Sequence, residues 1–396
     1  MSVSRWPVLL LTAMIGIQPL ATDLYLPALP GMREDLGATL AQAHLTLSAM
    51  LLGFGLSQLV WGPMADRFGR RPLLLMGCAG FALAGLGNML SESPEMLVIS
   101  RTLQGIAMGA VVMCGRAVVR DWYDPQGAAR MMAKAMTGLG VIAMLCGPIG
   151  AWTVSVWGWR STMSVHVIFG LLAWALIYWG FDESIRRRKP YAMRPRVLVG
   201  TWQRILAHRA FWAYGLLSIC TYGGVFIFLS NSSFVFMRWL GLSAPAYGAL
   251  IFSMSLTYIT STLLCRRLLL RFGVKRTVAI GGMLSMASAL SLVLSWLFVP
   301  ASVFSVMAPV YFYVLGHGIH QPCGQSGLVA PFPNAAGAAS SLGGFWMMVV
   351  AFAIGLVIGH FEDGSPTPMM LGVALWAALT AVVAWTLVQR LGPDHG

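Results

Sequence analysis

The sequence has few charged residues for its length. Charged side chains make up 10% of the 396 residues, against roughly 25% in an ordinary soluble domain, while apolar side chains make up 58%. A soluble chain of this size could not cover its surface with so few charges, so the excess apolar area must face lipid. The composition therefore predicts an integral membrane protein.

Several motifs that carry chemistry are absent. The six cysteines are scattered without a C-x-x-C pair, which disfavours a disulfide framework and a zinc site. No G-x-x-x-x-G-K-[ST] loop is present to cradle phosphate, which disfavours ATP-driven transport, and neither G-x-S-x-G nor H-E-x-x-H occurs. We therefore expect no enzyme activity, no catalytic residues, no metal and no cofactor.

Apolar stretches that are long enough to cross a bilayer recur along the chain. The first is too long for the core of a signal peptide and lacks a small-x-small cleavage site, so we expect it to be retained as a span. The stretches are residues 6–29, 41–62, 72–90, 96–118, 131–153, 161–180, 210–235, 245–269, 277–298, 302–324, 335–359 and 367–390.

A long polar segment, residues 182–209, divides the stretches into two groups of six and contains the basic run Arg186-Arg187-Arg188-Lys189. The sequence therefore predicts an all-α membrane protein of twelve transmembrane helices in two six-helix bundles. We expect residues 1–181 to form the first bundle, residues 182–209 a cytoplasmic basic linker, and residues 210–396 the second bundle.

The basic residues explain the net charge of +13 and set the orientation in the membrane. If the N-terminus is cytoplasmic, 21 of the 26 lysines and arginines fall on the cytoplasmic side of the predicted spans. This distribution is the positive-inside bias of membrane proteins. We therefore expect both termini and the linker in the cytoplasm, and the charge requires no nucleic-acid partner.

The two groups of spans share a short internal repeat. Asp66-Arg67-Phe68-Gly69 follows the second span, and Leu270-Arg271-Phe272-Gly273 follows the eighth, at an offset of 204 residues. Parallel six-span repeats are a known plan of transporters, with the substrate site between the repeats. The repeat therefore indicates a transporter built from two related halves.

The loop after the second span carries a longer motif. Residues 62–71 read G-P-M-A-D-R-F-G-R-R and match in full the pattern G-x-x-x-D-R-x-G-R-R, the loop signature of the major facilitator superfamily. The glycines permit a tight turn, and the acid and arginines can form a charge cluster. The chain thus resembles that superfamily, which implies a gating loop whose residues are Gly62, Asp66, Arg67, Gly69, Arg70 and Arg71.

Two further motifs resemble one subfamily and the superfamily as a whole. Residues 23–30 read D-L-Y-L-P-A-L-P, which looks like the D-x-Y-L-P-A-L-P signature of the Bcr/CflA-type drug:proton antiporters, and residues 101–105 read R-T-L-Q-G, similar to the R-x-x-Q-G element of the superfamily. The resemblance implies a proton-coupled exporter of multiple drugs or small amphipathic compounds, working by alternating access in a bacterial inner membrane.

A third motif resembles the G-P-x-x-G-G antiporter element of the superfamily. It reads G-P-I-G in the fifth predicted span, but Ala143 and Ala151 stand where that element prefers glycine. The residues that match are Gly147, Pro148 and Gly150.

Asp23 alone among the thirteen acids lies well inside a predicted span. An ionisable residue in a span is energetically costly, so it is a functional hypothesis by default. Pro27 has no N–H to donate to the Asp23 carbonyl, so we expect the helix to open there. A plain aspartate at a helix end is the structural alternative.

Arg101 is the expected partner of Asp23. Both residues lie roughly 10 Å from the outer face at a rise of 1.5 Å per residue, and the resemblance implies that the first and fourth helices line one cavity. Burial disfavours the charged carboxylate, whereas a nearby guanidinium favours it. We therefore expect proton coupling by an Asp23–Arg101 contact that is made in one conformation and broken in another.

The second group of spans has no buried acid but many aromatic residues. Such walls suit varied apolar ligands, although helix packing explains any one of these residues equally well. His317 and His320 are further candidates for proton transfer, with helix packing as the alternative. The candidates for a substrate cavity, from both halves, are Tyr25, Gln104, Tyr222, Phe226, Tyr258, Tyr313, His317 and Gln321.

Two other functions fit the same pattern. A proton symporter would import a nutrient or metabolite, and a membrane sensor on a transporter scaffold would move no substrate. An exporter lowers the amount of substrate that a cell retains, which separates it from both. We expect a small-molecule substrate, protons and the lipid bilayer as partners, a monomeric chain, and the proton gradient as the energy source.

Overall fold

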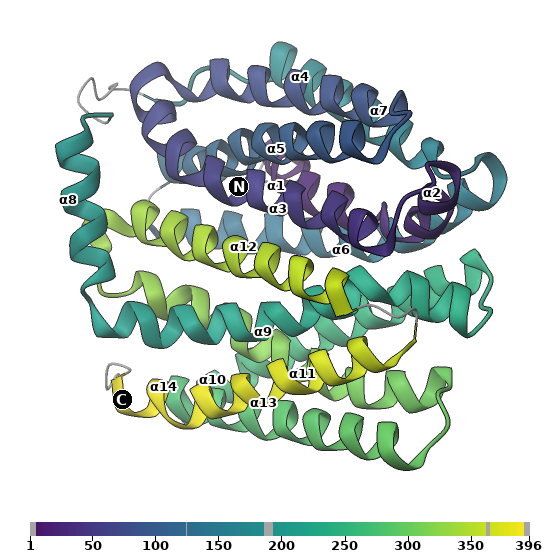
Figure 1. Cartoon of the computed structure of the whole chain (residues 1–396). Coiled ribbons are helices and arrows are strands. Elements are labelled where there is room, and N and C mark those ends of the chain that lie inside the picture. Colours follow the sequence, from purple (N-terminus) through teal and green to yellow (C-terminus); the bar gives the residue numbers. More distant parts are fainter. Residues whose placement is uncertain (1–4, 124, 186–192, 362–364, 392–396) are drawn as a thin grey trace. The chain divides into compact units, whose positions relative to one another are not determined.

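The computed structural model describes residues 5–123, 125–185, 193–361 and 365–391, which are helical apart from short connections (Figure 1). The basic run at residues 186–189 and the tail at residues 392–396 lie outside the described residues. The helices, including 3₁₀ and π segments, are α1 (Arg5–Thr22), η1 (Leu26–Ala28), α2 (Leu29–Asp35), α3 (Leu40–Phe68), α4 (Arg70–Met89), α5 (Pro94–Trp122), α6 (Pro125–Trp157), α7 (Arg160–Gly180), α8 (Pro195–Leu206), α9 (Arg209–Ser233), η2 (Phe234–Trp239), α10 (Ala244–Phe298), α11 (Val303–Val329), η3 (Pro333–Ala335), α12 (Ala336–Phe361), α13 (Thr367–Trp385) and α14 (Leu387–Leu391).

The lengths of the helices give twelve membrane spans. Within the described ranges, 11 helices are long and apolar enough to cross a membrane. One of them, α10, has 55 residues and would be roughly 80 Å long as a single rod, far beyond a hydrocarbon core of about 30 Å. Its backbone turns at Gly273, where φ is 72°, so α10 supplies two spans. The predicted all-α fold with twelve transmembrane helices is confirmed.

The chain divides into two compact units between Val199 and Gly200. In the first unit, α5 packs against α3 and α4, α4 packs against α7, and α1 packs against α6. In the second unit, α10 packs against α11 and α13, and α9 packs against α11, α12 and α13. Each unit therefore has a helix-packed core of its own.

The internal repeat corresponds to two turns with similar backbone conformations. Gly69, between α3 and α4, has a φ of 108°, and Gly273, within α10, has a φ of 72°. Such positive φ values are readily adopted by glycine and unfavourable for other residues. In each turn the arginine of the repeat lies 5.2 Å from the centroid of the neighbouring phenylalanine ring. The two turns thus share their backbone conformation and their arginine–phenylalanine contact as well as their sequence.

The segment predicted as a polar linker contains a helix, α8. Its apolar residues Leu198, Trp202 and Ile205 recur at the spacing of one helix face, and Ile205 is buried. The exposed arginines Arg196 and Arg204 alternate with them and lower the average apolarity of the segment. The average composition of the segment therefore predicts a polar connection, and this short amphipathic helix is not visible in that average.

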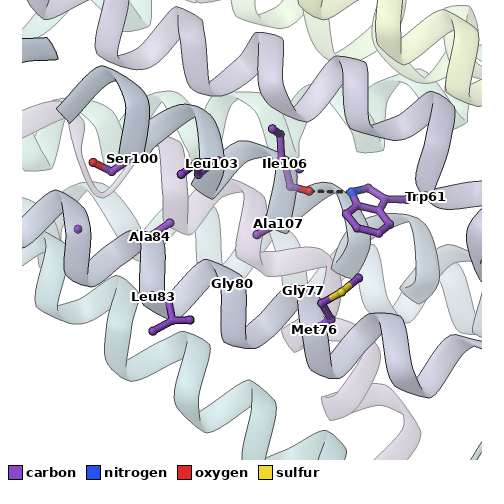
Figure 2. A pocket seen from close by; sticks show the side chains of 11 residues that line it. Trp61, Met76, Gly77, Gly80, Leu83, Ala84, Ser100, Leu103, Ile106 and Ala107 are labelled. Atoms are coloured by element: carbon purple, nitrogen blue, oxygen red, sulfur yellow. Dashed lines mark hydrogen bonds between the residues drawn. The ribbon is translucent and has the colours of Figure 1, made fainter. Parts of the chain in front are cut away.

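An apolar groove of about 410 Å³ runs between α4 and α5 on the first unit (Figure 2). Leu83 and Leu103 on its rim are 68% and 55% exposed, as expected for side chains that face lipid. Trp61 of α3 closes one end, and its Nε1 donates to the Ile106 carbonyl at 2.8 Å. Small residues line its floor, namely Gly77, Gly80, Ala84, Gly87, Ser100 and Ala107. The groove contains no residue of the predicted functional site.

Candidate functional site

The first span is interrupted at Asp23. α1 ends at Thr22, and a 3₁₀ turn that begins at Leu26 leads into α2. The Asp23 N–H still donates to the Pro19 carbonyl at 2.7 Å, but the Asp23 carbonyl accepts only a long bond of 3.4 Å, from the Leu26 N–H. Pro27 has no N–H to continue the α-helical ladder, so the helix opens at this point.

Beside this break, the backbone of α6 lies very close to the segment that follows α1. A Cβ atom built on Gly150 would overlap the carbonyl oxygen of Leu24 and lie 3.0 Å from its carbonyl carbon. Glycine therefore allows the α6 backbone to touch the segment that carries Asp23. Gly147 is also buried and Pro148 lies inside α6, so the element that resembles the antiporter motif packs beside the interrupted segment.

Arg101 of α5 is fully buried and holds the end of α1. Its guanidinium donates to the Ala21 carbonyl at 2.9 Å and to Gln104 Oε1 at 2.8 Å, and it lies 4.3 Å from the centroid of the Tyr25 ring. The last carbonyls of a helix lack helical partners and carry partial negative charge, so they attract a cation. Arg101 thus caps the C-terminal end of α1.

Asp23 and Arg101 do not form an ion pair in this structure. Among the described residues, the ion pairs of the first unit involve Arg70 and Arg160 instead. The Asp23 carboxylate is partly exposed and accepts a hydrogen bond from the Thr22 hydroxyl at 2.7 Å. An Asp23–Arg101 contact that forms in another conformation therefore stays a prediction.

His166 of α7 is a second side chain that holds the last turn of α1. Its Nε2 lies 3.0 Å from the Leu20 carbonyl oxygen. Because a carbonyl only accepts, this nitrogen carries the hydrogen, and Nδ1 of the neutral ring is an acceptor. The sequence interpretation missed His166, although an ionisable side chain inside the sixth predicted span was the available signal.

Two more polar residues, Thr46 and Asn88, complete this group in the first unit. Asn88 Nδ2 donates to Gln104 Oε1 at 2.9 Å, and the hydroxyl oxygens of Tyr25 and Thr46 lie 3.0 Å apart. We call the group the Arg101 cluster; its members are Tyr25, Thr46, Asn88, Arg101, Gln104 and His166. Four of its polar atoms are buried and have no hydrogen-bond partner among the residues that the structure describes, namely Arg101 Nε, Gln104 Nε2, Asn88 Oδ1 and His166 Nδ1. The cluster therefore keeps unused hydrogen-bonding capacity beside the break at Asp23.

The turn between α3 and α4 carries a second group, centred on Arg70. Arg70 donates to Asp66 at 2.6 Å and to Asp121 at 3.1 Å, and the Ser184 hydroxyl donates to Asp121 at 2.9 Å. Only 5% of Arg70 is exposed, so its charge needs these partners to offset the loss of hydration. This turn cluster joins the α3–α4 turn to the end of α5 and to the segment after α7.

Glu183 secures the same turn from the other side. Its carboxylate accepts from the backbone N–H of Arg70 at 2.9 Å and of Arg71 at 3.3 Å, where the free N–H groups and the dipole of α4 favour an anion. The Arg71 guanidinium donates to the Tyr178 carbonyl at 2.8 Å. Arg67 is exposed, and its guanidinium lies 4.0 Å from the sulfur of Met193, in the segment before α8. The loop motif alone does not reveal that Glu183 belongs to this turn.

In the second unit, three of the predicted cavity residues gather around Thr221. Tyr313 is buried, and its hydroxyl donates to the Thr221 carbonyl at 2.7 Å. His317 Nδ1 lies 3.0 Å from the Thr221 hydroxyl, and the Tyr258 ring lies 5.6 Å from the His317 ring. These contacts give Tyr313 and His317 packing roles within the unit, and their part in a substrate cavity stays a prediction.

The remaining candidates of the second unit have other surroundings. Phe226 is 2% exposed, Tyr222 is partly exposed, and Gln321 Nε2 approaches the Met347 sulfur at 3.6 Å. His320 Nε2 lies 3.1 Å from the Val278 carbonyl oxygen, so that nitrogen carries a hydrogen that is already engaged. The part of these residues in a substrate cavity or in proton transfer stays a prediction.

Comparison with known proteins decides the family. The sequence signature described as Major Facilitator Superfamily matches residues 11–356. This chain belongs to that superfamily. It is 26% identical to the chloramphenicol resistance protein of Pseudomonas aeruginosa, over 98% of this chain and 92% of that protein. It is 24% identical to the bicyclomycin resistance protein homolog of Haemophilus influenzae, over 94% of each. The predicted resemblance to the Bcr/CflA type is confirmed.

Solved structures agree on the fold of this superfamily member. The partially occluded inward-open structure of the xylose transporter XylE from E. coli matches with a TM-score of 0.75 at 15% identity, over 100% of this chain and 99% of that one. The family and the spans together make the chain a multi-pass membrane transporter of small molecules. Within the described ranges, no group of three or more histidine, cysteine, aspartate or glutamate side chains is placed to hold a metal ion.

Proposed function

We propose that this transporter is a proton-coupled exporter of small amphipathic compounds, working by alternating access. The observation that carries the proposal is Asp23, an ionisable side chain set into the break of the first span, in a chain similar over almost its whole length to drug-resistance proteins. The partly exposed carboxylate of Asp23 binds and releases the proton, and Arg101 adjusts its charge preference in the conformation in which the two meet.

The cavity and the gate follow from the same proposal. Residues 1–181 and 210–396 act as the two moving bundles, and the loop from Gly62 to Arg71 gates the cytoplasmic side. The buried donors and acceptors of the Arg101 cluster, with the aromatic candidates of both units, contact the substrate. The proton gradient supplies the energy without a cofactor, and the chain acts as a monomer.

An accumulation assay tests the function. Chloramphenicol, bicyclomycin and a fluorescent cationic dye are offered to a bacterial host that lacks its own efflux pumps, with and without a protonophore. Expression of the chain should raise resistance and lower accumulation of at least one compound, and the protonophore should reverse both effects. Increased accumulation would indicate an importing symporter, and unchanged accumulation across a broad panel would favour a sensor.

The orientation in the membrane is part of the proposal. Both termini and the segment between the bundles lie in the cytoplasm, because the reverse orientation would place 21 of the 26 basic residues outside. Alkaline phosphatase and a green fluorescent protein are fused separately to the C-terminus. We expect the fluorescent fusion alone to be active, and phosphatase activity would refute the orientation.

The gating role of Asp66 can be separated from its structural role. Asp66→Ala and Asp121→Ala each remove one carboxylate from Arg70, so both should lower stability, by about 1.5–3 kcal/mol per charged hydrogen bond. Only Asp66→Ala should slow transport out of proportion to this loss. The measurements are the thermal midpoint in detergent and initial efflux rates. Equal transport by the two variants would reject gating by Asp66.

His166 is expected to position the end of α1. His166→Gln retains an N–H donor that can reach the Leu20 carbonyl, whereas His166→Leu removes it and costs about 1–3 kcal/mol for the unpaired group. The glutamine variant should keep the pH profile of efflux. The leucine variant should shift it, because the Leu20 carbonyl that loses its hydrogen bond lies three residues before Asp23. The same shift in both variants would instead mean that the imidazole itself carries the proton.

A further inference from the structure

Two cysteines far apart in the sequence meet inside the second unit. Cys265 of α10 and Cys323 of α11 are each 2% exposed, and their sulfur atoms lie 3.9 Å apart. Both are free thiols. A disulfide bond is about 2.0 Å long, so the two sulfurs are in contact without being bonded.

The two helices are held in register at this point. One turn before Cys265, the Ser261 hydroxyl donates to the Leu315 carbonyl, and a Cβ atom on Gly318 would lie 2.6 Å from the Ser261 Cβ. The Cys265 sulfur in turn lies 3.9 Å from the Ile319 carbonyl oxygen. The close packing of α10 against α11 beside the two cysteines therefore limits the distance between their sulfur atoms.

The spacing of the sulfurs suits a bridging atom. Two bonds of about 2.3 Å, the length of a cysteine–zinc bond, span 3.9 Å at an angle of roughly 115°. A structural zinc ion would need four ligands, and no third histidine, cysteine or acid joins the pair among the residues that the structure describes. The ligand that fits is a soft, thiophilic atom that binds two thiolate sulfurs. Its complex with the two thiolates should be neutral, because a buried net charge is costly.

We propose that Cys265 and Cys323 form a dithiol site for trivalent organoarsenicals. In the reaction of R–As(OH)₂ with the pair, two As–O bonds break and two As–S bonds form. Each thiol proton leaves on a hydroxide as water, and arsenic keeps its +3 oxidation state. Reactant and product are both neutral, so the reagent can enter through lipid and the product remains compatible with the helix interface.

The probe for this site is phenylarsine oxide, added to the purified full-length transporter and followed by intact-protein mass spectrometry. We expect one phenylarsenic adduct per chain that survives excess 2-mercaptoethanol and is removed by 2,3-dimercaptopropanol, because only a two-point attachment resists a monothiol. Cys265→Ser and Cys323→Ser should each lose the resistant adduct. An adduct that is stripped by the monothiol, or that persists in either variant, overturns the proposal.

The chain offers its own matched control. Cys78 of α4 and Cys114 of α5 are also buried on packed helices, but no hydrogen bond joins their thiols among the described residues. Cys78→Ser and Cys114→Ser should keep the resistant adduct. A second readout, dibromobimane, becomes fluorescent when both of its arms alkylate thiols. It should respond in the control variants and fail in Cys265→Ser and Cys323→Ser even where these fold normally by their thermal midpoint.

Discussion

Asp23→Asn should abolish proton-driven uphill export while leaving substrate binding in place. Asparagine keeps the size and hydrogen-bonding ability of the side chain, so the contact with the Thr22 hydroxyl can persist. It cannot take up or release a proton at usable pH. The variant should still exchange labelled for unlabelled substrate across vesicle membranes, but substrate-induced proton release should fall to the level of empty vesicles.

Asp35→Asn is the matched control for the loss of one acid. Asp35 lies at the end of α2, and its exposed carboxylate pairs with Arg160 and accepts from the Trp159 ring nitrogen at 3.0 Å. An exposed ion pair contributes about 0–1 kcal/mol, so this variant should keep its coupling. Proton-dependent uphill export by Asp23→Asn would place the coupling site elsewhere, and His166 would become the first residue to replace.

Gly150→Ala should reduce transport about tenfold or more, although it adds a single methyl group. The new Cβ would overlap the Leu24 carbonyl oxygen, and a backbone atom cannot move aside as a flexible side chain can. Overpacking of this kind costs about 1–3 kcal/mol, and a shift of 1.4 kcal/mol between conformations is already tenfold in their populations. Initial efflux rates at equal expression measure the effect.

Gly215→Ala is the control for a glycine within a membrane helix. Gly215 lies inside α9, and a Cβ atom there would meet nothing within 4 Å. Alanine also favours the helix by about 1 kcal/mol over glycine, so this variant should transport normally and be slightly more stable. Normal transport by Gly150→Ala would show that the close approach of α6 to the break is dispensable.

The spans, the turns and the break in the first helix could be predicted from the sequence because each leaves a local signal. Apolar runs of twenty residues predict membrane helices, the glycines of residues 62–71 predict a tight turn after the second span, and Pro27 predicts an opening near Asp23. In each case the residues that make the feature are neighbours in the chain.

Contacts between residues far apart in the chain could not be predicted in the same way. In this structure Arg101 binds the Ala21 carbonyl, a group that every residue has and that becomes available only where a helix ends, and its contact with Asp23 in another conformation stays a prediction. Glu183 binds the start of α4 from 113 residues away, and Cys265 meets Cys323 across 58. Such contacts depend on which helix faces meet, and one sequence does not encode that locally.

The turn cluster also has a consequence for the order in which the protein is made. Arg70 leaves the ribosome long before its last supports, because Asp121 follows it by 51 residues and Glu183 by 113. Before Asp121 is made, Asp66 is the one of its two carboxylate partners that is present, and the backbone N–H of Arg70 gains Glu183 only later. The first unit can therefore close its turn only after α7 is synthesised, yet before any helix of the second unit exists. The first half can thus be inserted and completed as a module of its own while the second half is still being made.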